Sequence, residues 1–315
     1  MSKRIEWIDV AKAIGIVLVV YGHVILGLHD SGLWTGFINY RALHDVIYSV
    51  HMPLFFFLSG IFAINWVERA PGTAIGKKAL TLLVPYFLWG FIQASVMQVF
   101  AGSTNNGQGL ANAVKLPFIP YAQFWFLYDL FWIFLIYYLL INYLHLTTKV
   151  FIILSFILML VSPYLGYWEL WRISYHMIFF AIGTLILKHH QWINRVNFWA
   201  VVMVTVILNS LMLTLSLNIF WHNALTFVVA CSGILLLAKI SKGIKSKKID
   251  SVGRQSMVIY LLHLMFTAGS RIMLMKVGMD NLYIQMLIGL LLGVFAPLFV
   301  LFIANKMRIS KYLFG

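Results

Sequence analysis

The first long apolar segment carries a lysine and a histidine on one face. Lys12 and His23 are eleven residues apart. In an α-helix this is about three turns, so both side chains share a stripe and lie about 16 Å apart along the axis, about half the hydrocarbon thickness of a bilayer. An ionisable group inside a membrane helix indicates a functional site, and the alternative is a histidine that only hydrogen-bonds a neighbouring helix. A neutral imidazole suits general-base catalysis near pH 7, and Asp9 can fix Lys12 by pairing with it at i, i+3.

A second group of histidines lies in the next apolar segment. His44, Tyr48 and His51 share one helical face, and Pro53 follows closely. Proline removes a backbone hydrogen bond and is expected to kink the helix, and a kink lets polar groups gather in a cavity. Because this segment enters from outside, we expect His51 to reach a depth similar to that of His23. We predict that the two imidazoles meet near the midplane; a kinked helix with packed histidines is the alternative.

Two adjacent lysines, Lys77 and Lys78, precede the third apolar segment. They are expected at the same membrane surface as Lys12, so the three ammonium groups can hold a phosphorylated cytoplasmic donor as point charges. From physics alone, lysines that only snorkel to the membrane surface are the stronger interpretation.

Further ionisable side chains lie at or near membrane depth: Asp129, Glu169, His176, His222 and His263. Glu169 is flanked by Trp168 and Trp171, and an aromatic platform beside a carboxylate suits a sugar and a membrane interface equally well. The sequence contains neither a metal-ligand cluster such as His-Glu-x-x-His nor a glycine-rich phosphate loop, so we predict no metal site.

Composition places these residues in a membrane protein. Of the 315 residues, 62% are hydrophobic and 10% are charged, and the mean hydropathy is +0.90. Soluble domains contain about 25% charged residues. We therefore predict an all-α polytopic protein with one transmembrane domain over residues 1–315 and no separate soluble domain. About ten apolar segments are long enough to cross a bilayer: 10–28, 44–66, 79–100, 123–144, 149–166, 174–188, 197–217, 222–240, 255–275 and 283–304.

The basic residues indicate how these segments are oriented. Ten spans put both termini on one side, and only five Lys and Arg residues fall on the other side: Arg41, Lys115, Arg172, Arg271 and Lys276. The positive-inside rule then predicts that both termini are cytoplasmic. The net charge of +14 is thus a topology signal and does not indicate nucleic-acid binding. The dense run Lys239–Lys248 is a solvated loop or, alternatively, a site for anionic lipid or a phosphorylated ligand. The first segment has no clear cleavage site, so we expect it to be retained as a span.

Several motifs in this chain resemble those of one family. They are Asp9-x-x-Lys12 with Gly22-His23, His51-Met-Pro53 running on to Ser59-Gly60, Lys77-Lys78 leading to Pro85-Tyr86, Trp125-Phe126-Leu127, and Val252-Gly253 leading to His263. Over about residues 5–304 the chain resembles the integral-membrane acyltransferase-3 family, which includes bacterial O-acetyltransferases of surface and secreted sugars. It looks most like the fucose-4-O-acetylase-like branch. The resemblance implies a ten-span fold, cytoplasmic acyl-CoA, an acceptor hydroxyl on the far side, an essential His23, and a Lys12 that helps to hold donor or site.

These observations together predict an O-acyltransferase of the bacterial inner membrane. It would transfer acetyl from acetyl-CoA to a hydroxyl of a cell-surface or exported glycan. We assign catalysis to His23, Lys12, His51 and Asp9, and donor binding to Lys12, Lys77 and Lys78. His23 would act as general base, with an acyl-histidine intermediate as the alternative, and His51 would polarise the thioester carbonyl or bind the acceptor.

Two functions of other classes compete with this prediction. Intramembrane histidines and kinked helices also suit a transporter or flippase for a glycan or lipid-linked sugar. Many transporters carry internal repeats, and no repeat is evident in this sequence. A sensor or structural membrane protein is the third interpretation. The predicted partners are the lipid bilayer, acyl-CoA and a carbohydrate acceptor, and no nucleic acid.

Overall fold

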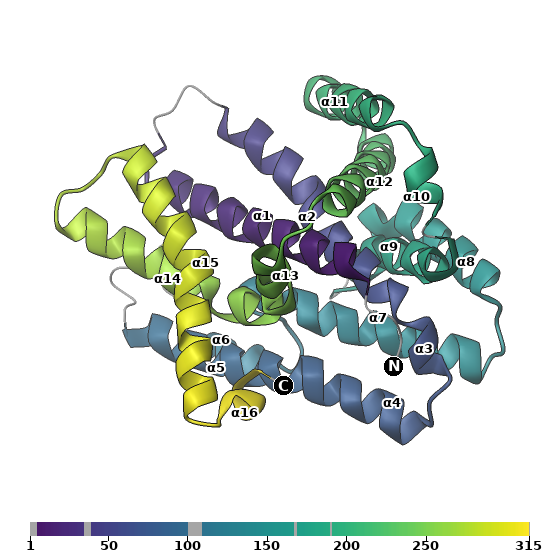
Figure 1. The fold of residues 1–315 in the computed structure, drawn as a ribbon, viewed down its shortest axis with the longest axis horizontal. Helices are drawn as coiled ribbons and strands as arrows, with labels where there is room; N and C mark the ends of the chain where they lie inside the picture. Colours follow the sequence, from purple (N-terminus) through teal and green to yellow (C-terminus); the bar gives the residue numbers. More distant parts are fainter. Residues whose placement is uncertain (1–4, 35–38, 100–108, 167–168, 190, 315) are drawn as a thin grey trace.

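The computed structural model describes residues 5–34, 39–99, 109–166, 169–189 and 191–314, and this part of the chain is helical without any strand (Figure 1). Among the described residues, seven helical stretches are long and apolar enough to cross a membrane: Glu6–Asp30 (α1), Tyr40–Ile61 (α2), Pro71–Val99 (α4, η1 and α5), Ala122–Asn142 (η3 and α7), Ile219–Gly243 (α12), Ser256–Lys276 (α14) and Leu282–Lys306 (α15). The predicted all-α polytopic class is thereby confirmed.

Three shorter apolar stretches occupy the other predicted segments: Thr148–Tyr164 (α8 and η4), Leu170–His189 (α9) and Phe198–Thr214 (α11). Each of the ten predicted segments therefore contains a helix, while the number of spans and the cytoplasmic termini stay predictions. The remaining described helices are short connectors: Ile64–Val67 (α3), Ala111–Lys115 (α6), Trp192–Arg195 (α10), Lys247–Arg254 (α13) and Ser310–Phe314 (α16).

Helix α1 runs through the middle of the bundle and packs against α2, α12, α13, α14 and α15 (Figure 1). Val10, Ala11, Ile16, Val20 and Ile25 have no exposed surface, which accounts for its nearly continuous run of apolar residues. A helix that is apolar on most sides belongs inside a bundle. The polar side chain of His23 is therefore surrounded by other helices.

Two glycines hold α2 tightly against α9. A Cβ atom on Gly60 would collide with the carbonyl oxygen of Phe180, and one on Gly183 would collide with that of Phe57. Small residues at membrane helix crossings allow such close backbone approach. Because α2 also packs on α1, this contact fixes the histidines of α2 relative to α1.

The proline in the second segment does not interrupt the helix. Helix α2 continues through Pro53 to Ile61, and the chain then turns into α3 with the Ala63 N–H donating to the Gly60 carbonyl at 3.0 Å. The predicted segment 44–66 therefore extends too far, because its last residues belong to α3.

The third segment contains a change of helix type. Residues Ala79–Leu83 form the π-helical turn η1 between α4 and α5, directly after Lys77 and Lys78. The Thr81 hydroxyl donates to the Lys77 carbonyl at 2.9 Å. Single π turns within α-helices are rare and frequently lie at functional sites.

Candidate active site

His23 lies against a second buried histidine from a distant part of the chain. The ring centroids of His23 on α1 and His263 on α14 are 5.1 Å apart, and their planes are inclined by 48°. His263 has no exposed surface, and His23 is half-buried. This pair and its neighbours Tyr48, His44 and His51 are called the histidine cluster below.

Tyr48 connects the histidines of α2 to this pair. Its ring lies 6.3 Å from that of His23 and 4.7 Å, edge-on, from that of His51. It also stacks on His44 at 3.9 Å. The Tyr48 hydroxyl is buried and has no hydrogen-bond partner among the described residues. His23 and His51 are therefore both neighbours of the Tyr48 ring.

Backbone carbonyls fix which ring nitrogen carries hydrogen in the buried histidines. Nδ1 lies 2.7 Å from the Ile47 carbonyl in His51, and 2.8 Å from the Tyr260 carbonyl in His263. A carbonyl oxygen only accepts, so Nδ1 donates in both rings and Nε2 of the neutral ring holds the lone pair. Nε2 of His263 is buried without a partner in the described part of the chain. The Nε2 atom of each neutral ring is therefore a hydrogen-bond acceptor.

Because Gly22 has no side chain, the Tyr48 ring can lie directly against the backbone of α1. A Cβ atom at Gly22 would lie 3.0 Å from Cε2 of Tyr48, closer than side chains ordinarily pack. The glycine directly before His23 therefore lets α2 carry its tyrosine up to the histidine cluster.

Basic side chains gather at the other end of α1. The Lys78 ammonium lies 4.6 Å from the centroid of the Trp66 ring, and the Arg69 guanidinium lies 4.0 Å from it. Lys78 is also close enough to Lys12 and Arg69 for their charges to interact. The structure therefore brings the predicted residues Lys12 and Lys78 together and adds Arg69.

A cavity of about 450 Å³ opens beside these basic residues. Its lining, in the part of the chain that the structure describes, consists of Trp66, Lys77, Leu80, Thr81, Val84, Lys311 and Tyr312. It lies between the π-helical turn η1 and the C-terminal helix α16. We call it the inner cavity because the predicted topology places it at the cytoplasmic side. Its lining includes both Lys77 and Lys311.

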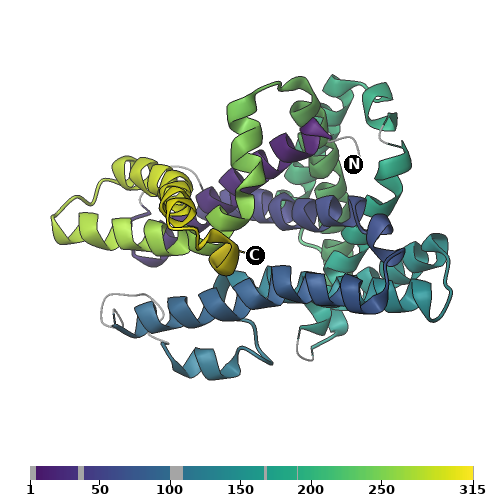
Figure 2. The same cartoon turned by 60° about the horizontal axis from the view of Figure 1, so that its bottom comes forward.

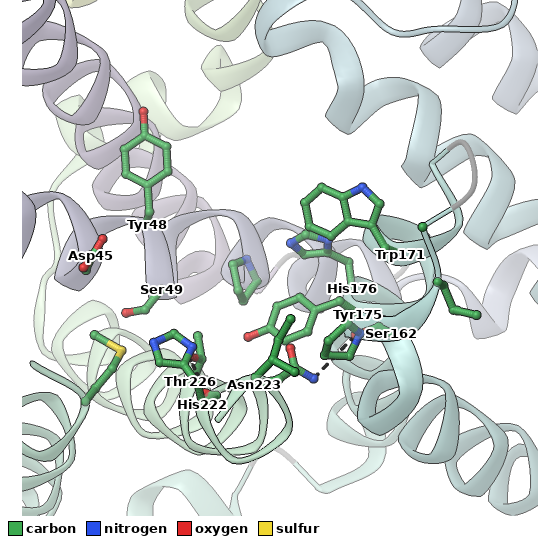
Figure 3. Close-up of a pocket in the computed structure, with 16 residues that line it drawn as sticks. Asp45, Tyr48, Ser49, Ser162, Trp171, Tyr175, His176, His222, Asn223 and Thr226 are labelled. Atoms are coloured by element: carbon green, nitrogen blue, oxygen red, sulfur yellow. Dashed lines mark hydrogen bonds between the residues drawn. The ribbon is translucent and has the colours of Figure 1, made fainter. Parts of the chain in front are cut away.

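A larger pocket of about 660 Å³ lies between α2, η4, α9 and α12 (Figure 3). Asp45 and Ser49 of α2 border one part of it near His222 and Thr226 of α12, and Trp171 of α9 borders another. Carboxylate, hydroxyl, imidazole and amide groups beside an aromatic ring are a lining that can bind a small polar molecule in a fixed orientation. This pocket is called the outer pocket because the predicted topology places it away from the cytoplasm. Tyr48 belongs to its lining and to the histidine cluster, and the Tyr48 ring points away from Ser49 and His222 of the pocket (Figure 3).

The two acids near membrane depth have different surroundings. Asp129 on α7 is fully buried, and neither of its carboxylate oxygens has a hydrogen-bond partner in the described part of the chain. Glu169 pairs with Arg172, whose Nε lies 2.8 Å from Oε2 and whose Nη2 lies 3.0 Å from Oε1. Burial raises the pKa of Glu169 above its ordinary value, and the Arg172 charge opposes this shift. The predicted aromatic neighbour Trp168 lies outside the described residues.

Comparison with known families decides the class of this protein. A family model described as an acyltransferase domain, that of acyltransferase-3, matches residues 5–305. The chain belongs to the acyltransferase-3 family. No curated protein and no solved structure matches it. The match covers the histidine cluster and the basic residues near Lys12, and it ends before α16.

The predicted site residues of this membrane acyltransferase fall at two levels. His23 and His51 lie in the histidine cluster, whereas Lys12, Lys77 and Lys78 lie at the end where Trp66 and Arg69 gather. Helix α1 is continuous from Glu6 to Asp30, so the expected separation of about 16 Å between Lys12 and His23 applies. The pairing of Asp9 with Lys12, like the catalytic role of each residue, stays a prediction.

Sequence reasoning missed three residues that the structure places beside the predicted site residues of this acyltransferase. His263 was recognised as an intramembrane histidine but not as the ring neighbour of His23, because no spacing rule relates residues so far apart. Arg69 follows Trp66 at i+3, which was a readable signal for a cation over an aromatic ring. Lys311 lies beyond the last apolar segment, where a sequence offers no sign of what the chain folds back onto.

Proposed function

We propose that this membrane acyltransferase is an O-acetyltransferase of the bacterial inner membrane, which moves acetyl from acetyl-CoA to a hydroxyl of a cell-surface or exported glycan. The observation that supports the proposal is the His23–His263–Tyr48 cluster, which lies along the bundle between the basic end at Lys12 and Lys78, predicted to be cytoplasmic, and the polar outer pocket. Donor and acceptor would thus approach the same imidazole from opposite sides.

In the proposed reaction, His23 acts as general base. Its ring nitrogen takes the proton of the acceptor hydroxyl while the hydroxyl oxygen attacks the thioester carbonyl. The carbon–sulfur bond then breaks, and the imidazolium returns the proton to the leaving CoA thiolate. In the alternative acyl-histidine route, the same His23 nitrogen would first attack the thioester carbonyl and displace CoA thiolate. The acceptor hydroxyl oxygen would then attack the acyl group, the N–acyl bond would break, and the released imidazole would take the hydroxyl proton and pass it to the thiolate.

His51 and His263 would hold the reacting groups in place. Because Nδ1 of each donates to a backbone carbonyl, Nε2 of each neutral ring can only accept. This supports binding of the acceptor hydroxyl by His51 rather than polarisation of the thioester carbonyl, which needs a donor.

The donor would bind at the basic end through Lys12, Lys77 and Lys78. Lysine ammonium groups attract phosphate as point charges, whereas arginine makes two parallel hydrogen bonds. Arg69, held over Trp66, would supply one such planar group beside the lysines. Membership of an acyltransferase family does not favour the transporter or flippase considered from the sequence.

The proposal is tested by transfer of labelled acetyl from acetyl-CoA in membranes that contain the wild-type protein, with the surface glycans of the cells as acceptors. We expect an alkali-labile glycan ester with the wild type. His23→Gln should lower its rate by about 10²–10⁴-fold, as loss of a general base does. His145→Gln, which changes an exposed imidazole in the α7–α8 connection, is the matched control. Full activity of His23→Gln would contradict both the general-base and the acyl-histidine route.

A further inference from the structure

The C-terminal helix α16 forms one wall of the inner cavity. It follows α15 and packs against α5 (Figures 1 and 2). Lys311 and Tyr312 of α16 face Lys77, Leu80 and Val84 across a space of about 450 Å³.

Two contacts anchor α16 in this position. The Trp89 indole N–H donates to the Leu313 carbonyl at 2.7 Å, and the Phe314 ring stacks on the Trp89 ring with centroids 5.6 Å apart. Arg308, between α15 and α16, adopts the left-handed conformation with φ +60°, so the chain turns sharply after α15. These contacts with the buried Trp89 fix the position of α16, and therefore of its side chains, relative to α5.

The walls of the cavity combine positive charge with aromatic surface. Lys77 and Lys311 supply two ammonium groups, and Thr81 supplies a hydroxyl. Tyr312 has 66% of its surface exposed, and Trp66 adds a second ring. None of the described residues that line the cavity is acidic, and Arg69 and Lys78 lie over the Trp66 ring behind it.

This chemistry fits a nucleotide that carries several phosphates. The ammonium groups attract phosphate, and an exposed tyrosine ring can stack on a purine base. The volume lies in the ordinary range for small-molecule sites. An anionic lipid headgroup would use the same ammonium groups but has no use for an aromatic wall, so the rings favour the nucleotide.

We propose that α16 completes the donor site, with Lys311 and Tyr312 binding the phosphorylated adenosine end of acyl-CoA opposite Lys77. This inference rests on the proposed function. It assigns donor binding to residues beyond the family match, which ends at residue 305. Lys77 would hold phosphate from the α4 side, Lys311 from the α16 side, and Tyr312 would cover the base.

The test is direct binding of CoA to the purified full-length protein, measured by calorimetry without any acceptor. Lys311→Ala should weaken CoA binding about threefold to tenfold through loss of a charge-assisted contact. Tyr312→Ala should weaken it about tenfold through loss of stacking. S-acetylpantetheine, which lacks the nucleotide, should bind all variants equally. Lys306→Ala and Tyr283→Ala change exposed residues outside the cavity and are the matched controls.

The outcomes separate the inference from the proposed function. Wild-type protein that binds no CoA overturns both. If the wild-type protein binds CoA and the folded variants Lys311→Ala and Tyr312→Ala bind it equally tightly, only the role of α16 is overturned. If those variants bind CoA normally but retain less anionic phosphatidylglycerol than the wild type, the cavity is a lipid site instead. Lys311→Arg, which keeps the charge, should restore at least part of the CoA affinity and so exclude a folding defect.

Discussion

The imidazole of His263 lies 5.1 Å from that of His23 between centroids, with its Nδ1 held by the carbonyls of its own helix. A ring fixed in this way directs Nε2 to one side, and the neutral ring is held in the tautomer with hydrogen on Nδ1. His263 therefore has the geometry of a residue that orients the His23 ring or the group bound to it.

We expect His263→Asn to lower kcat by about ten- to a hundredfold, because misplacing a catalytic group by about 1 Å can cost a factor of about 10². KM for acetyl-CoA should stay within about twofold, since the proposed nucleotide site beside Lys77 is far from this ring. Steady-state kinetics with varied acetyl-CoA separate the two constants. A His263→Asn protein with normal kcat would show that the contact between the two rings only contributes to packing. A fall in kcat counts as evidence only if the variant is produced in the same yield as the wild type.

Gly22 provides a second test of the same cluster. Gly22→Ala places a methyl group 3.0 Å from the Tyr48 ring, so the ring or helix α2 must shift by a few tenths of an ångström. We expect a several-fold fall in kcat with little change in unfolding temperature. Gly269→Ala on α14, whose Cβ would meet nothing within 4 Å, is the matched control and should keep full activity. Equal activity of the two variants would mean that the position of Tyr48 does not matter for transfer.

Hydropathy and charge were sufficient to predict the class of fold and the approximate place of each helix, because burial of apolar length in lipid is a local property of the sequence. Helical periodicity also put Lys12 and His23 on one stripe. Contacts between helices are a different matter. The meeting of His23 with His263, or of Lys77 with Lys311, depends on how distant helices pack, and no spacing in the sequence encodes that.

Local irregularities escaped prediction for a related reason. The π turn over Ala79–Leu83 replaces a stretch that reads as ordinary apolar helix. The fold of α16 against Trp89 depends on a side chain more than two hundred residues earlier in the chain. In both places the structure depends on a tertiary interaction, which the local sequence pattern does not predict.

Gly253 tests how α13 is held against the start of α1. A Cβ atom at this position would collide with the backbone carbonyl of Asp9, which cannot move aside as a side chain can. We expect Gly253→Ala to lower the free energy of unfolding by about 1–3 kcal/mol, the usual cost of overpacking. Gly243→Ala meets nothing within 4 Å and is the control. Thermal unfolding in detergent measures both, and equal melting of the two variants would contradict the close packing of α13 on α1.

The ion pair of Glu169 with Arg172 predicts a dependence of stability on pH. Burial raises the pKa of Glu169 above its ordinary value of 4.5, although Arg172 opposes the shift. A carboxyl whose pKa is higher in the folded than in the unfolded state favours folding most at low pH, where it is protonated in both states. Its contribution is lost as the pH rises from the unfolded pKa through the folded one.

Glu169→Gln removes this titration. The difference in unfolding temperature between variant and wild type should therefore shift in favour of the variant as the pH is raised from below 4.5 through the folded pKa, and level off above it. Thermal unfolding of both proteins across this range provides the measurement, with Glu68→Gln, an exposed glutamate, as the control. A shift in the opposite direction would mean that the Arg172 charge outweighs burial and that the ionised pair stabilises the start of α9.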